Sequence, residues 1–163
     1  MNADTPLKYT RLATLRDVPV IVEMVKQLVN TTGYSDLPPD GKKTVRMVET
    51  FIIQQPHDTL MLVSVDDQGS VVGFLAAMTF QLMHSLEPIA IEVGWYTDPN
   101  APDLKKRNME LRKSYEEWAR RKGMRYAQYA VLNPTEKDIH AIEKNPKTTV
   151  LELVYHRAIG KES

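Results

Sequence analysis

Hydrophobic residues follow two kinds of spacing along this chain. Apolar residues recur every third or fourth position, the period of an amphipathic helix, at residues 15–33, 42–55 and 104–122. Alternating or continuous runs rich in β-branched residues, typical of strands, occupy residues 9–14, 59–65, 71–83, 89–97, 125–131 and 148–158. Asn133 begins a short helix with a narrow apolar face. The pattern therefore predicts the element order βααβββαβαβ.

Local signals at the ends of these segments agree with that order. Thr14 and Asp17 have the spacing of a capping box at the start of the first helix. The connection 66–70 contains the Asp and Gly residues of a short hairpin, so the strands on either side are expected to pair antiparallel. A length of 163 residues suits one compact core. We expect residues 1–163 to form a single α/β domain.

The stretch from Ile89 to Gly123 is the most informative part of the sequence. Its strand contains Gly94, where a bulge or a close backbone approach is favoured. EVGWYTDP, then a charged linker and LRKSYEEWARRKG, resembles the central motif of the GNAT superfamily, the N-acetyltransferases that use acetyl-CoA. The resemblance implies a single GNAT-like α/β domain with a mixed, mostly antiparallel sheet and helices on both faces. In that family the central strand splays from its neighbour to admit the pantetheine arm.

The turn after the central strand departs from the family pattern. In GNAT proteins it carries an Arg or Gln and two glycines, whose backbone N–H groups bind the diphosphate of CoA at the start of a helix. In this chain the corresponding places fall at Asp103, Lys106 and Asn108, and no glycine lies between Gly94 and Gly123. We therefore expect the GNAT architecture with an altered cofactor turn.

Basic residues outnumber acidic ones between Lys105 and Arg125. Near the helix start, the resemblance implies that Lys105, Lys106, Arg107 and Asn108 bind the CoA phosphates in place of the missing glycines. Two other interpretations are open. One is a solvated helix face with i,i+4 ion pairs, and the other is contact with nucleic acid, which is disfavoured because aromatic residues are sparse and no nucleic-acid motif is present.

Few side chains are candidates for acetyl-transfer chemistry. Glu92 lies on the central strand, where many GNAT members place a carboxylate base; the alternative is a glutamate that faces solvent or pairs with an arginine. The backbone N–H groups of Tyr96 and Thr97 are the implied oxyanion and pantetheine contacts. His140 and Tyr155 are candidate proton donors to the leaving thiolate. For these two, an exposed histidine and a core tyrosine are the alternatives.

Composition restricts the remaining classes of function. Lys plus Arg and Asp plus Glu both number 21, so no global charge points to nucleic acid or to an anionic membrane. The absence of cysteine excludes disulfides, thiolate metal sites and cysteine nucleophiles. The N-terminal residues lack the features of a secretory signal, and the longest apolar run, 71–80, is too short to span a bilayer. We expect a cytoplasmic protein, in the host cytoplasm or virion if the chain is viral.

Two smaller features allow more than one interpretation. Tyr34, Ser35 and Asp36 lie between the first two helices, a position that borders the acceptor cleft in GNAT-like proteins, or they form a solvated loop. Met78 and Met83 lie near the end of a strand, where methionine fills a core more often than it forms a binding surface.

Two functions follow from the sequence. The first is an N-acetyltransferase that transfers the acetyl group of acetyl-CoA to an amine on a small molecule or a protein. The second is a catalytically inactive GNAT-fold protein that forms a homo-oligomer or joins a larger assembly, for example as a bacteriophage virion component. The altered turn is the feature that supports the second.

Overall fold

A computed structural model describes residues 7–32, 37–55 and 57–130. The strands are β1 (Thr10–Leu12), β2 (Thr59–Val65), β3 (Val71–Gln81), β4 (Pro88–Thr97) and β5 (Ala127–Gln128). The helices are α1 (Val18–Asn30), α2 (Gly41–Gln54) and α3 (Leu104–Arg121), and a 3-10 turn, Leu15–Asp17, precedes α1. This order matches the predicted one as far as the strand after α3. The expected final helix and strand lie outside the described residues.

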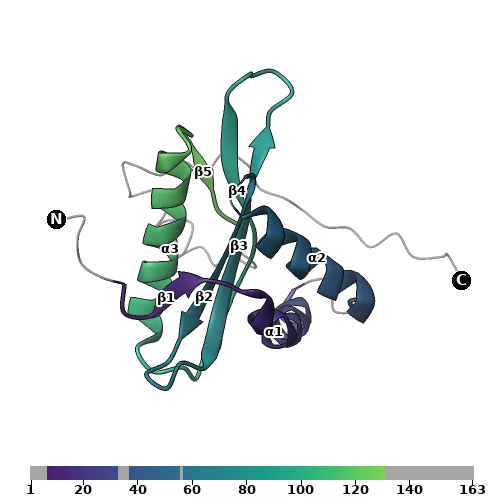
Figure 1. Cartoon of the computed structure of the whole chain (residues 1–163), viewed down its shortest axis with the longest axis vertical. Helices are drawn as coiled ribbons and strands as arrows, with labels where there is room; N and C mark the ends of the chain where they lie inside the picture. The colour runs from purple at the N-terminus through teal and green to yellow at the C-terminus, as the bar shows by residue number, and fades with distance from the viewer. Residues whose placement is uncertain (1–6, 33–36, 56, 131–163) are drawn as a thin grey trace, which may run out of the picture. The chain divides into compact units, whose positions relative to one another are not determined.

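The strands form one sheet in the order β1-β2-β3-β4-β5. All neighbours pair antiparallel except β4 and β5, which pair parallel. Helices α1 and α2 cover one face of the sheet and α3 covers the other (Figure 1). The predicted α/β fold, with a mixed, mostly antiparallel sheet between helices, is therefore confirmed for the described part of the chain.

Strand alternation builds a separate core on each face. In β2, Met61 and Val63 point into the core under α1 and α2, whereas Leu60 and Leu62 point into the core under α3. The apolar side of α3, including Leu111, packs into the second core. Because helices cover both faces, side chains on both sides of the central strands are buried, and these strands therefore have nearly continuous apolar sequences.

Aspartate side chains accept backbone hydrogen bonds where the two N-terminal helical segments begin. The Asp17 carboxylate accepts hydrogen bonds from the Thr14 backbone N–H at 2.8 Å and from the Thr14 hydroxyl at 3.0 Å. Arg11 also donates two bonds of 2.8 Å to Asp17. At α2, the Asp40 carboxylate accepts from the Lys43 N–H at 2.7 Å. The predicted capping box thus starts the 3-10 turn that precedes α1, whereas the side chain of Asp40, which is not among the predicted capping residues, caps α2 directly.

The segment around the β3–β4 connection differs from the expectation that its methionines fill a core. Met83 and Leu86 there are fully exposed, and Phe80 is 45% exposed, so Met83 does not fill a core. The reason is that the β3–β4 hairpin extends past the described helices, so nothing in that part of the chain covers its tip (Figure 1). Within the described residues, no helix has the length and apolar character needed to cross a bilayer.

Candidate active site

The central strand β4 carries a bulge. Its register against β3 pairs Ala76 with Gly94 but Ala77 with Glu92, so Val93 is the extra residue. Such a bulge bends a strand and locally redirects its side chains. The sequence pattern predicts the irregularity at Gly94, one residue away, and a Cβ at that glycine would lie 3.4 Å from the Phe74 ring.

Strands β4 and β5 part just before this bulge. They pair only at Ala90 with Ala127 and at Ile91 with Gln128. Beyond that point the Ala130 N–H donates to the Glu92 carboxylate, at 3.0 Å, rather than to a β4 carbonyl. The outer edge of β4 after Glu92 is therefore unpaired within the described residues, and Glu92 lies at the fork.

Ladder alternation decides which backbone groups face this open edge. Asp98 donates its N–H to the Val72 carbonyl at 2.9 Å, and partners on an antiparallel strand alternate every second residue. Tyr96 therefore directs its N–H towards β3, whereas Trp95 and Thr97 direct theirs to the open edge. The expectation for Thr97 agrees with this geometry, but the second outward N–H belongs to Trp95 rather than Tyr96.

Glu92 is half-buried in the α3 side of the fork. Burial raises the pKa of its carboxyl group above the ordinary glutamate value, while the bond from the Ala130 N–H acts in the opposite direction. The buried Tyr115 hydroxyl, which donates to the Gln128 carbonyl at 3.0 Å, also has a raised pKa, mainly from burial and next from the Glu92 charge. A half-buried carboxyl that gains a proton more readily than usual has the property a general base needs near neutral pH.

The start of α3 forms a second polar feature. Asp103, its N-cap residue, has φ +56°, and it is the one non-glycine residue with positive φ in the described ranges. Its carbonyl accepts from the N–H groups of Lys106 and Arg107, at 2.8 and 3.1 Å. The N–H groups of Leu104 and Lys105 have no hydrogen-bond partner among the described residues. When a residue with left-handed backbone conformation is followed by one with right-handed conformation, the successive N–H groups point into a common concavity that can bind an anion.

Arg107 does not serve as the free cation that the sequence suggests. Its side chain is 1% exposed. The guanidinium donates to the Pro102 carbonyl at 2.6 Å and to the Val65 carbonyl, approaches the Ser64 hydroxyl at 3.5 Å, and lies 4.2 Å from the Tyr9 ring centroid. The phosphate-binding expectation for Arg107 is therefore wrong, because its donors are used inside the protein.

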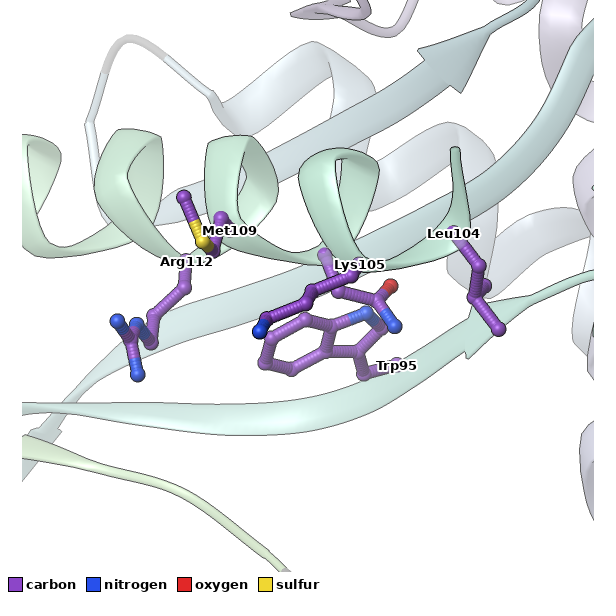
Figure 2. Close-up of a pocket in the computed structure, with 6 residues that line it drawn as sticks. Trp95, Leu104, Lys105, Met109 and Arg112 are labelled. Atoms are coloured by element: carbon purple, nitrogen blue, oxygen red, sulfur yellow. The ribbon is translucent and has the colours of Figure 1, made fainter. Parts of the chain in front are cut away.

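A groove of about 410 Å³ lies between β4 and the first turns of α3. Figure 2 shows the Trp95 indole rising from β4 beneath α3, with Lys105 and Arg112 on the helix beside it. Asn108 also lines the groove, and its side-chain oxygen accepts from the Thr97 hydroxyl at 2.8 Å. The remaining lining residues are Leu104 and Met109.

The groove brings together part of the predicted set. Lys105 and Asn108 line it, and Thr97 contacts it through Asn108. Lys106 is not among its lining residues and pairs with Asp103 at 2.9 Å. Glu92, Tyr96 and Arg107 are described but are not among the lining residues. The remaining candidates lie outside the described residues: Tyr34, Ser35, Asp36, His140 and Tyr155.

Sequence reasoning misses three residues of this site. The sequence pattern assigns Trp95 only to strand packing, and it includes Arg112 only as part of the basic run. Arg112 lies seven residues after Lys105, two helical turns along the same face, and this spacing is the available signal. The contact of Tyr9 with Asp103 has no local signal, because the two residues are 94 positions apart.

Comparison with solved structures identifies the fold. No family model matches the sequence, and no curated protein matches it. AAC(6')-Iy, in complex with the bisubstrate analogue CoA-S-monomethyl-acetylneamine, is 16% identical with a TM-score of 0.66, covering 91% of this chain and 96% of its own. The aminoglycoside 6'-N-acetyltransferase AAC(6')-Ih from Acinetobacter baumannii is 16% identical with a TM-score of 0.67, covering 93% and 98%.

A GNAT family acetyltransferase from Staphylococcus aureus gives a TM-score of 0.60 at 11% identity, covering 92% of this chain and 97% of its own. At these identities the likeness concerns the fold. The similarity extends over nearly the whole of each structure, and the described part of this chain has the bulged central strand and the fork that the resemblance implies. The chain has the fold of the GNAT-family acetyltransferases.

Proposed function

We propose that this protein is an N-acetyltransferase that transfers the acetyl group of acetyl-CoA to an amine. The observation that carries the proposal is the fork between β4 and β5. Glu92 lies where the two strands separate, and backbone N–H groups of β4 face the gap between them. A slot of this kind admits a narrow flexible chain, and the open N–H groups are donors for its amide and carbonyl oxygens.

The residues around the groove fit CoA in charge and in hydrogen bonding. Lys105 is exposed and has no acidic partner in the described part of the chain, while Arg112 is 3.7 Å from Glu116 and also faces the groove. The unpaired N–H groups of Leu104 and Lys105 add a helix start suited to a phosphate. Bound acetyl-CoA would supply an acetyl group activated as a thioester. In this proposal the charges of Lys105 and Arg112, together with the N–H groups that follow Asp103, take the role that the glycine turn has in GNAT proteins.

Glu92 is the proposed base. As the new C–N bond forms and the C–S bond breaks, the amine loses a proton that the Glu92 carboxylate accepts, and the departing thiolate takes a proton from a donor. His140 and Tyr155 remain the candidates for that donor. Of the two outward N–H groups, at Trp95 and Thr97, one would donate to the carbonyl oxygen of the group being transferred. The other lies two residues along the strand, too far to share that oxygen, and would donate to an amide oxygen of the pantetheine arm.

Thiol release tests the proposal directly. Because the chain contains no cysteine, a thiol reagent reports free CoA without background from the protein. We expect acetyl-CoA to raise the melting temperature, and one of a set of amines to give amine-dependent thiol release together with an acetylated product identified by mass spectrometry. Neamine-type aminoglycosides are the first amines to test, given the structural neighbours. No stabilisation by millimolar acetyl-CoA would reject the proposal.

Two substitutions separate a basic role of Glu92 from a structural one. Glu92→Gln keeps an oxygen that can accept from the Ala130 N–H but removes the base, whereas Glu92→Ala removes both. A base predicts that both variants lose about 10²–10⁴-fold in kcat. A purely structural role predicts that the Gln variant retains the wild-type rate and only the Ala variant loses it.

A second candidate is a non-catalytic protein that works through assembly. The exposed apolar tip of the β3–β4 hairpin, with Phe80, Met83 and Leu86, supports it, because such groups favour protein contacts. A bacteriophage virion component is one such assembly. Absence of CoA binding combined with a stable oligomer in solution would favour this second candidate over the first.

A further inference from the structure

Asp103 is the N-cap residue of α3, yet its carboxylate does not cap the helix. Aspartate is a preferred N-cap residue because its side chain accepts from the N–H of the second or third helical residue. Asp40 behaves in this way at the start of α2, where it accepts from Lys43 at 2.7 Å. Two things differ between these residues. Asp40 has the extended backbone usual for a capping residue (φ −68°, ψ 118°), whereas Asp103 is left-handed (φ +56°, ψ 30°), and the Asp103 carboxylate has partners on neighbouring side chains.

Two groups hold the Asp103 carboxylate away from its helix. The Tyr9 hydroxyl donates to one carboxylate oxygen at 2.9 Å, and the Lys106 ammonium lies 2.9 Å from the other. The Lys106 side chain is 68% exposed, so this ion pair restrains the carboxylate weakly. Tyr9 is only 5% exposed. The tyrosine is therefore the principal restraint.

Tyr9 is held in a fixed orientation. Its backbone N–H donates to the Glu110 carboxylate at 2.8 Å, and its ring faces the buried Arg107 guanidinium. The Lys8 ammonium donates to the Tyr9 hydroxyl oxygen at 3.1 Å. Because an ammonium has no acceptor, the single hydroxyl proton of Tyr9 must point to Asp103. The bond to Asp103 consequently has one direction and a rigid donor.

The consequence concerns the first N–H groups of α3. With the carboxylate held by Tyr9, the N–H groups of Leu104 and Lys105 have no partner among the described residues. These two residues also line the groove beside Trp95. If the bond to Tyr9 were lost and Asp103 relaxed to the extended backbone that Asp40 has, its carboxylate would be free to accept from the Lys105 N–H. It would then place a negative charge where an anion would bind.

We propose that Tyr9 is a positioning residue for cofactor binding: its hydroxyl holds the Asp103 carboxylate away from the start of α3 and so keeps the Leu104 and Lys105 N–H groups open to a phosphate. The identification of that phosphate with CoA rests on the proposed function. Tyr9 does not touch the cofactor, and acts through Asp103 alone.

Tyr9→Phe tests the proposal in the full chain, because it removes the hydroxyl and keeps the ring against Arg107. We expect the dissociation constant for CoA to rise about fivefold, which corresponds to about 1 kcal/mol, the usual strength of a side-chain cap. The Lys105 amide should exchange its hydrogen about fivefold more slowly by NMR, because it gains a partner. Pantetheine, which lacks the diphosphate, should bind as it does to the wild type.

Asp103→Gly provides the decisive background, since glycine adopts the left-handed conformation without strain and has no carboxylate to release. In that background Tyr9→Phe should change neither CoA affinity nor exchange of the Lys105 amide. Tyr126→Phe, at a 63% exposed tyrosine, is the matched control and should change neither quantity.

Three results would overturn the proposal. One is a Lys105 amide whose exchange is unchanged in Tyr9→Phe, and another is a loss of CoA affinity that persists in the Asp103→Gly background. The third is an equal loss of pantetheine binding, which would indicate general damage. Should the wild-type protein bind neither CoA nor inorganic diphosphate, the proposed function fails, and amide exchange alone still decides whether Tyr9 restrains Asp103.

Discussion

The two faces of the sheet bury polar groups in different ways. Under α1 and α2 the buried groups include neutral hydroxyls bonded to carbonyls of α2 and of its N-cap residue: Thr44 donates to Asp40 at 2.8 Å and Thr59 to Phe51 at 2.7 Å. The Asp17 carboxylate at the start of α1, 6% exposed, is also buried, but it is paired with Arg11. Under α3 the buried guanidinium of Arg107 donates to backbone carbonyls and has no acidic partner among the described residues. Burial of charge costs free energy that apolar packing must offset. We therefore expect the α1–α2 face to contribute mainly folding stability, and the α3 face to contain a buried cation without an opposite charge beside the candidate site.

The largest expected effect tests the α1–α2 face. Ile21 is fully buried under the sheet, so Ile21→Ala should lower the free energy of unfolding by about 3 kcal/mol through lost burial and a residual cavity. Urea denaturation measures this change. Below the unfolding transition, CoA affinity should equal that of the wild type. Altered CoA affinity in the folded variant would show that the two faces are coupled and would contradict the separation of their roles.

The next effect tests the charged face. Arg107→Met keeps most of the volume but leaves the carbonyls of Pro102 and Val65 without their donor, which should cost about 2 kcal/mol. Unlike Ile21→Ala, this variant should also weaken CoA binding, because Arg107 fixes the first turn of α3. Urea denaturation and calorimetry measure the two quantities. A variant with wild-type stability would mean that Arg107 contributes no net stabilisation to the fold.

Much of the charged face is predictable from helical phase. Arg107 precedes the buried Leu111 by four residues and so lies on the apolar stripe of α3, which distinguishes it from the neighbouring Lys105 and Lys106. Periodicity also locates β4, and Gly94 indicates the bulge to within one residue. The strands and helices follow from such local patterns because each buries one continuous apolar face.

Other parts of the site depend on contacts that no local pattern contains. The bulge at Val93 changes which residues of the following part of β4 hydrogen-bond to β3. As a result the N–H of Trp95, rather than the expected N–H of Tyr96, faces the open edge. The restraint of Asp103 by Tyr9 joins residues distant in sequence. Exposure of Met83 depends on how far the hairpin extends beyond the described helices. Each of these requires the tertiary structure.

A smaller effect concerns acid stability at the start of α1. Arg11 and the Thr14 donors hold the pKa of Asp17 at about 2, below its ordinary value of 3.8. A lowered folded-state pKa gives stability that is present above about pH 4 and lost as the pH falls towards 2. Because Arg11 is partly exposed, we expect about 1 kcal/mol after screening. Asp17→Asn should remove this part of the pH dependence in urea titrations.

The matched control for that titration is Asp67→Asn. The Asp67 side chain is 74% exposed and pairs with Lys8 at 3.1 Å on the surface. Surface pairs of this kind contribute little to stability. An Asp17→Asn variant with the same acid transition as the wild type would show that the Arg11 pair contributes nothing at low pH.

The smallest effect on folding is expected at the β3–β4 hairpin tip, which none of the described helices covers. Met83 and Leu86 are fully exposed there, so replacing both with serine should change the free energy of unfolding by less than about 0.5 kcal/mol. The same double variant separates the two candidate functions. If the tip mediates assembly, light scattering should show a smaller particle than for the wild type, whereas an enzyme that acts through the fork should keep its rate of acetyl transfer. A large loss of stability would mean that the tip is covered in solution, and the contrast between covered faces and an uncovered tip would then not hold.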